Sequence, residues 1–230
     1  MPTASRPVGP FVVKDSALIA LATGLRAENL KEFRDGLVRV PLASIYYHFW
    51  GRLLRPGFDE PEYNNDFASW AYHGLHEKPL AERLSMIDPA GYEDLEALRQ
   101  RVVEVVEELL DESGTVPWAR ADQQFYFVQS QTVVLDAGLV LSSPAELPAA
   151  VLGFSTGTIF YHVIDARRRT SDRVDDFTEW LREFGTTYAR VVEGLKRLDP
   201  YFSSLVELRR IIAGICQACR TPEPARKVPR

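Results

Sequence analysis

The chain has 230 residues, 46% of them hydrophobic and 11% aromatic, which is enough apolar material for a packed core. Its net charge of -5 argues against a protein whose whole surface follows nucleic acid, because such binding depends on neutralising many phosphates. No run approaches the roughly 18 apolar residues of a membrane span, and no basic stretch followed by an apolar one marks a signal peptide. We therefore expect a cytoplasmic protein that does not enter a membrane, with flexible tails at residues 1–10 and 220–230.

The sequence matches itself at a nearly constant offset. Shifting it by 114 positions aligns Phe11–His48 with Phe125–His162 without a gap. Among the identical pairs are Tyr47 with Tyr161, His48 with His162 and, at a shift of 110, Asp66 with Asp176 and Trp70 with Trp180. This pattern predicts two repeats, residues 11–113 and 125–219, joined by a linker at residues 114–124.

Each repeat begins with two β-prone runs. In the first repeat these are Phe11–Lys14 and a run that ends at Gly24, with polar residues between them. Such a pattern predicts a short β-hairpin, although Ala17–Ala22 is also a good helix sequence.

The rest of the repeat reads as helices in chain order. Asn29 is a good N-cap for a helix over Leu30–Leu37, and Pro41 fits the start of a helix that runs to Arg55 and carries His48. The further predicted helices run from Asn65 or Asp66 to about His76, over Leu80–Ile87, and over Tyr92–Asp111. The predicted fold is therefore mainly α with a short β-hairpin per repeat, as two tandem pseudo-symmetric helical repeats packed as one body.

Three motifs carry a resemblance to a known family. They are Ser44-Ile45-Tyr46-Tyr47-His48-Phe49, Asn65-Asp66-Phe67-Ala68-x-Trp70 and Leu80-Ala81-Glu82-Arg83-Leu84. Together they resemble an uncharacterised bacterial family, a domain of unknown function, over nearly the whole chain, and the resemblance implies no particular activity. The chain is also similar to small accessory or recognition modules in which an aromatic-x-His string precedes Asn-Asp-Phe-x-x-Trp, and its second copy departs from them because Asp175 replaces Asn65.

The paired histidines are the leading candidates for a site. If the copies pack about a pseudo-twofold axis, both imidazoles can face one shared groove. The alternative is that each histidine bonds to the aspartate of its own copy and fixes two helices together. We predict a non-catalytic accessory or regulatory protein that binds a partner protein or small ligand between the repeats, through Tyr47, His48, Arg52, Asp66, Tyr161, His162 and Asp176.

Two other functions compete with this hypothesis. A metal-dependent enzyme would use a divalent metal held by His48, His73 and His76, since the last two share a helical face. A regulator of the TetR type would read DNA with Val40–Phe49 and Phe154–His162, which resemble the end of a recognition helix.

The common catalytic signatures are missing from the sequence, so no catalytic residue and no obligatory cofactor is predicted. Cys216 and Cys219 form a C-x-x-C pair inside an apolar helical stretch, where idle thiols are expected. The oligomeric state is left open.

Overall fold

The computed structural model describes residues 8–55, 62–112, 119–201 and 203–218. Most of the two predicted tails, residues 114–118 of the predicted linker and Cys219 lie outside the described residues. The described residues form two compact units. Unit I is Ala17–Val133, and unit II consists of the described residues up to Ser16 and from Val134 onward.

The fold is mainly α-helical with one two-stranded sheet. Strand β1 spans Phe11–Ala27 and strand β2 spans Phe125–Leu141. The helices of unit I are α1 (Leu30–Arg39), α2 (Leu42–Trp50), the 3-10 turn η1 (Gly51–Leu54), α3 (Asp66–His73), α4 (Lys78–Ser85), η2 (Pro89–Gly91) and α5 (Leu95–Glu112). Those of unit II are η4 (Pro144–Glu146), α6 (Leu147–Leu152), α7 (Thr156–Ile159), the π-helical turn η5 (Phe160–Asp165), α8 (Ala166–Arg169), α9 (Asp176–Arg182), η6 (Gly185–Tyr188), α10 (Ala189–Lys196) and α11 (Leu205–Ala218).

Local capping explains where several helices begin. The side chain of Asn29 accepts a hydrogen bond from the backbone N–H of Glu32, and that of Asn65 accepts one from Ala68. These two predicted caps are confirmed. The helix predicted to run to Arg55 ends earlier, at Trp50, and the chain continues as the 3-10 turn η1. Among the described residues, no helix combines the length and apolar composition of a membrane span.

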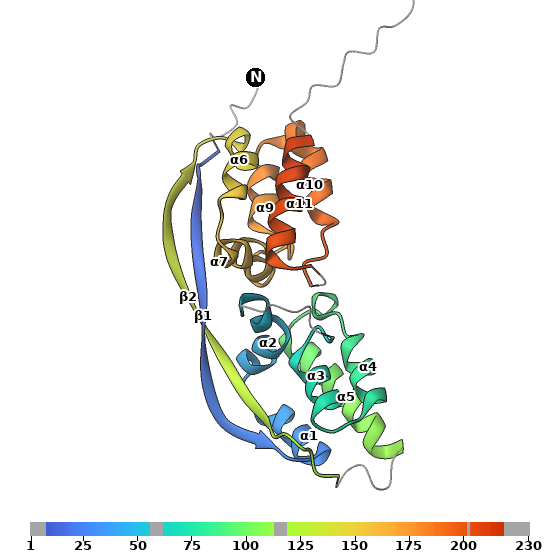
Figure 1. Cartoon of the computed structure of the whole chain (residues 1–230). Coiled ribbons are helices and arrows are strands. Elements are labelled where there is room, and N and C mark those ends of the chain that lie inside the picture. The colour runs from blue at the N-terminus through green and yellow to red at the C-terminus, as the bar shows by residue number, and fades with distance from the viewer. Residues whose placement is uncertain (1–7, 56–61, 113–118, 202, 219–230) are drawn as a thin grey trace, which may run out of the picture. The chain divides into compact units, whose positions relative to one another are not determined.

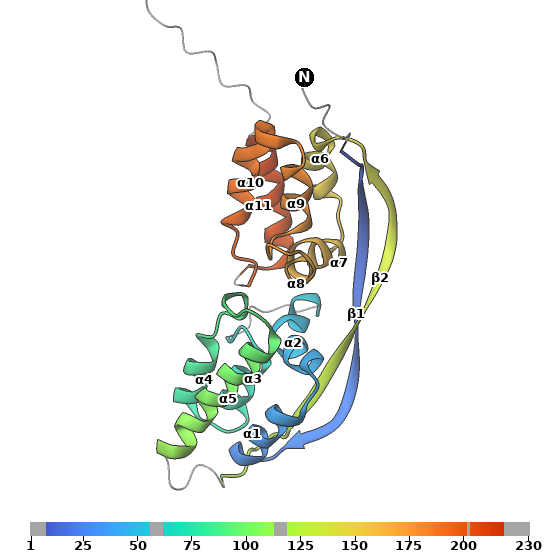
Figure 2. The ribbon, with the colours of Figure 1, turned by 180° about the vertical axis from the view of Figure 1, so that it is seen from behind.

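The prediction of a short β-hairpin in each repeat is wrong. Both strands are continuous over 17 residues and pair with each other, running in opposite directions (Figures 1 and 2). Asp15 and Ser16, where a turn was expected, are extended within β1. A hairpin of two short strands is marginally stable by itself, whereas two long strands pair many more backbone groups without a second turn.

The prediction of two tandem helical repeats packed as one body is also wrong. The chain separates into two compact units, and the boundary between them falls inside both strands. Unit I combines its helices with the end of β1 and the start of β2, and unit II combines its helices with the start of β1 and the end of β2. The helices of each unit therefore pack on a strand segment that the self-alignment of the sequence had assigned to the other repeat.

Aromatic side chains attach these strand segments to the helices. In unit I, Phe125 and Phe127 of β2 are buried, and the ring centroid of Phe125 lies 5.1 Å from that of Phe33 in α1 and 5.5 Å from that of Trp70 in α3. In unit II, Phe11 of β1 lies 5.2 Å from the ring of Trp180 in α9. Burial of such rings is a main source of stabilisation in each unit.

Gly36 in α1 provides a test of this packing. A Cβ atom at Gly36 would lie 2.3 Å from a ring carbon of Phe127, so Gly36→Ala must displace the strand side chain. We expect this change to lower the free energy of unfolding of unit I by about 1–3 kcal/mol, measured by urea denaturation.

Gly214→Ala is the matched control. Gly214 lies inside α11, and a Cβ there would meet no atom within 4 Å. The helix-propensity gain of alanine should therefore raise stability by about 0.5–1 kcal/mol. Equal stability of Gly36→Ala and the unchanged protein would contradict the packing of Phe127 on α1.

Candidate functional site

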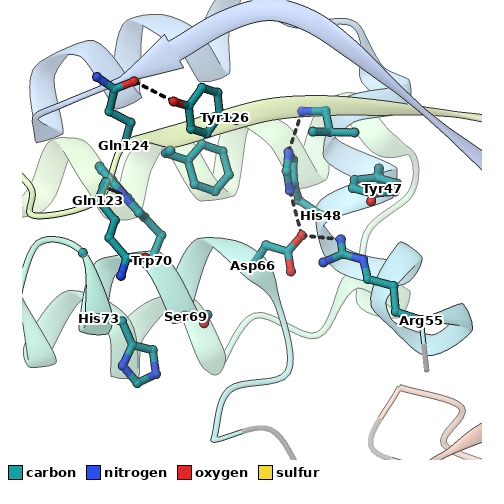
Figure 3. A pocket seen from close by; sticks show the side chains of 13 residues that line it. Tyr47, His48, Arg55, Asp66, Ser69, Trp70, His73, Gln123, Gln124 and Tyr126 are labelled. Atoms are coloured by element: carbon teal, nitrogen blue, oxygen red, sulfur yellow. Dashed lines mark hydrogen bonds and ion pairs between the residues drawn. The ribbon is translucent and has the colours of Figure 1, made fainter. Parts of the chain in front are cut away.

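His48 connects a helix of unit I to strand β2. Its side chain is only 3% exposed. Its Nδ1 atom lies 2.9 Å from Oδ2 of Asp66, and its Nε2 atom lies 3.1 Å from the backbone nitrogen of Val128 (Figure 3). Because a backbone N–H can only donate, Nε2 must be the unprotonated acceptor, and Nδ1 carries the proton that is donated to Asp66.

Arg55 completes this cluster. Its Nη2 atom lies 2.8 Å from the same Oδ2 atom of Asp66, and its guanidinium lies over the ring of Tyr47 at 4.8 Å from the centroid. Arg52, the arginine that we predicted to contact a ligand or partner, is not part of this cluster, since its guanidinium donates to the backbone carbonyl of Tyr63. Its role in binding stays a prediction. The sequence could have indicated Arg55, because the shift of 114 positions aligns it with another arginine, Arg169.

The same contacts occur in unit II. His162 lies 2.7 Å from Oδ2 of Asp176 through Nδ1, and its Nε2 accepts the backbone N–H of Lys14 at 2.9 Å. Arg169 bonds to Oδ2 of Asp176 at 2.9 Å and lies 4.0 Å from the ring centroid of Tyr161. The interpretation in which each histidine bonds to the aspartate of its own copy is thus confirmed.

Each cluster is complete within its own unit. Every contact of the first cluster joins residues of unit I, and every contact of the second joins residues of unit II. These contacts give no support to the predicted groove that both histidines share. A ligand site must therefore be sought inside a single unit.

Electrostatics in unit I favour a neutral imidazole beside a charged carboxylate. Burial lowers the pKa of His48, and it outweighs the opposite effect of Asp66. For Asp66, burial alone would raise the pKa, but the hydrogen bonds from His48 and Arg55 and the charge of Arg55 lower it below the ordinary value. The directions agree with the proton on Nδ1 of His48.

A pocket opens beside the first cluster. Its volume is about 650 Å³, within the usual range of small-molecule sites, roughly 300–1,000 Å³. Figure 3 shows Asp66, Ser69 and His73 along one side and Gln123 and Tyr126 along the other. The lining residues are Tyr47, His48, Arg55, Asp66, Ser69, Trp70, His73, Gly74, Gln123, Gln124, Phe125, Tyr126 and Val128, all of unit I.

The floor of the pocket is fixed by Trp70. Its indole N–H donates to the backbone carbonyl of Gln123 at 2.7 Å, which holds the entry to β2 against α3. Gly74 follows at the end of this helix, and the residue at the corresponding place in unit II is Phe184, whose ring lies 5.5 Å from that of Trp180. In unit I, the indole of Trp70 lies where a Cβ atom of Gly74 would stand.

The predicted metal ligands do not come together. Both ring nitrogens of His48 already have protein partners. His73 lies 3.7 Å from a carboxylate oxygen of Glu62, and His76 lies 2.7 Å from one of Asp122. Within the described parts of the chain, no group of three or more histidine, cysteine or acidic side chains is arranged to hold a metal.

The two segments that resemble a DNA-recognition helix are largely buried. In α2, the buried residues are Ser44, Ile45, Tyr46, His48, Phe49 and Trp50. In the corresponding segment of unit II, Gly157–Phe160 and His162 are buried. A recognition helix needs an exposed face to enter the major groove, and neither segment presents one.

Cys216 is buried in α11 of unit II. It borders a second, more apolar pocket of about 220 Å³. The expectation that the cysteines are idle stays a prediction.

Comparison with known proteins places the chain in a recognised group. The model of DUF5752, a family of unknown function, matches residues 8–217. Among solved structures, OrfY from Thermoproteus tenax is similar, with a TM-score of 0.77 and 27% sequence identity, and the match covers 92% of this chain and 96% of that one. No match is found among curated proteins.

The buried His48, with its hydrogen bonds to Asp66 and Val128, should make the stability of the protein depend on pH. Because burial lowers the folded-state pKa of His48, the unfolded chain takes up a proton first as the pH falls. The free energy of unfolding should therefore decrease from about pH 6.5, the ordinary histidine pKa, downward until the folded-state pKa is passed. Urea unfolding between pH 7 and 5 measures this effect.

His48→Gln and His73→Gln separate this effect from the rest of the protein. Glutamine can both donate to Asp66 and accept from Val128 without titrating, so His48→Gln should flatten the pH dependence. His73 has a side chain that is 55% exposed, and His73→Gln should leave the profile unchanged. A His48→Gln profile as steep as that of the unchanged protein would assign the titration elsewhere.

Asp175 in unit II offers a second electrostatic prediction. Burial raises the pKa of Asp175 although the backbone N–H and hydroxyl of Thr178 donate to its carboxylate. When the folded-state pKa of a carboxyl group is raised, the free energy of unfolding decreases as the pH rises above the ordinary pKa of that group in the unfolded chain. Asp175→Asn keeps the capping oxygen, as Asn65 does in unit I, and should raise the free energy of unfolding at pH 7, measured by urea denaturation.

The reciprocal change serves as the control. Asn65→Asp places a charge in a buried cap and removes the amide that donates to the carbonyl of Leu84 at 3.1 Å. It should destabilise the protein at pH 7, and less so at pH 4. Stabilisation by both changes would show that burial does not decide the effect.

Proposed function

The chain belongs to the DUF5752 family, whose function is unknown, and from the geometry of unit I we propose that it is a non-catalytic accessory or regulatory protein that binds a small polar ligand in the pocket beside His48. The observation that carries this proposal is that protein groups already occupy both ring nitrogens of His48. Both nitrogens of His48 are engaged, one by Asp66 and one by the N–H of Val128. An imidazole with both nitrogens engaged is not available as a general base or a metal ligand.

Groups suited to binding line the same pocket. The side chain of Arg55 is 46% exposed and that of His73 is 55% exposed, so both are accessible to a ligand in the pocket. Ser69 and Gln123 add a hydroxyl and an amide. Such a mixture of donors and acceptors supports recognition of a small polar molecule.

The regulatory part of the proposal rests on the position of the start of β2 in the wall of the pocket. Gln123 and Gln124 before β2, and Phe125, Tyr126 and Val128 at its start, border the cavity, and the backbone N–H of Val128 donates to His48. A ligand that contacts this wall and Asp66 together stabilises the attachment of the strand to α2 and α3. Ligand binding and strand attachment are therefore linked, and each should favour the other.

Ser69→Tyr tests the proposal. The residue lines the pocket from α3, so a tyrosine there fills space that a ligand needs. We expect a ligand found by thermal-shift screening of polar metabolites to lose at least tenfold in affinity in this variant, measured by calorimetry.

Glu179→Tyr is the matched control. Glu179 occupies the corresponding, exposed position in α9 of unit II, at an offset of 110. This variant should bind as the unchanged protein does. A ligand bound equally by both variants would place the site outside this pocket, and binding of a protein partner blocked by Ser69→Tyr would replace the small ligand by a macromolecule.

A further inference from the structure

The two clusters differ in how fully their arginines are engaged. In unit II, the guanidinium of Arg169 bonds to two carboxylates, Asp176 at 2.9 Å and Asp165 at 3.1 Å, and also to the carbonyl of Tyr161 at 3.0 Å. In unit I, Asp66 is the one carboxylate among the described residues that bonds to Arg55. Within the described parts of the chain, the guanidinium of Arg55 thus bonds to fewer carboxylates than that of Arg169.

The sequence explains this difference. Asp165 is 4% exposed and lies at the position that corresponds to Gly51 of unit I, at the offset of 114. Glycine has no side chain to offer, and the ring of Tyr47 packs where a Cβ atom would stand. Unit II therefore carries an internal second carboxylate for its arginine, and unit I carries none at this position.

The neighbouring carboxylate also keeps a free side. Both bonds of Asp66, to His48 and to Arg55, use Oδ2. The Oδ1 atom has no bond to any described residue, and Asp66 lines the pocket. The pocket thus offers donors of Arg55 next to an acceptor of Asp66, a few ångströms apart.

We infer that the ligand of unit I is a small carboxylic acid with a hydrogen-bond donor next to the carboxylate, as in an α-amino or α-hydroxy acid. This inference rests on the proposed function and names its ligand. The ligand's carboxylate bonds to Arg55 in the manner of Asp165 on Arg169, and its amino or hydroxyl group donates to Oδ1 of Asp66. The planar fork of an arginine suits a carboxylate better than an ammonium does, and stacking on Tyr47 restricts its orientation.

Calorimetry with small acids and neutral probes, among them the matched pair lactate and lactamide, tests the inference. Glutamate, alanine, malate and lactate are titrated into the full chain, with lactamide and glycerol as neutral probes. At least one acid should bind, and lactamide and glycerol should bind at least tenfold more weakly than that acid.

Arg55→Lys is the decisive variant. It keeps the positive charge beside Asp66, so the fold should persist with a melting temperature close to that of the unchanged protein, but it removes the forked donors. We expect at least a tenfold loss of affinity for the acid. Arg169→Lys in unit II is the matched control and should bind the acid unchanged.

The outcomes distinguish this inference from the proposed function. Binding of a neutral probe as tight as that of any acid, with a loss in Ser69→Tyr, overturns the carboxylate and keeps the pocket. An acid whose affinity is unchanged in folded Arg55→Lys overturns the role of Arg55. If neither these probes nor the metabolite screen yields a ligand that Ser69→Tyr blocks, both proposals fail.

Discussion

Both units depend on one interaction, the donation of a strand backbone N–H into the ring of a buried histidine. A strand in a two-stranded sheet has one edge without a partner strand, and a buried N–H without an acceptor costs free energy. The Nε2 atoms of His48 and His162 accept the N–H groups of Val128 and Lys14. The histidine therefore joins strand to helix by a hydrogen bond as well as by packing.

The aspartate and arginine follow from this requirement. Nε2 can accept only if the proton sits on Nδ1, and an aspartate that accepts from Nδ1 fixes that tautomer. The carboxylates, Asp66 and Asp176, are partly buried, so each needs a positive partner, which Arg55 or Arg169 supplies. A backbone hydrogen bond thus accounts for three charged or polar side chains in each unit.

The same arrangement explains why binding is expected in one unit more than in the other. In unit II, Asp165 takes up donors of Arg169, and Phe184 packs on Trp180. In unit I, the corresponding residues are Gly51 and Gly74, and the cluster borders an open pocket. Unit I thus has glycines where unit II has Asp165 and Phe184, and its cluster borders a pocket.

The sequence by itself determined the features that depend on neighbouring residues. Caps such as Asn29 and Asn65 start helices because their side chains bond within the next turn, and the importance of His48 and Asp66 was visible in their recurrence. Tertiary structure decided the rest. Strand β1 pairs with a strand more than 100 residues away instead of forming a local hairpin. The 3-10 turn after Trp50 places Arg55 rather than Arg52 beside Asp66. Both outcomes depend on long-range pairing and burial, which local sequence patterns do not encode.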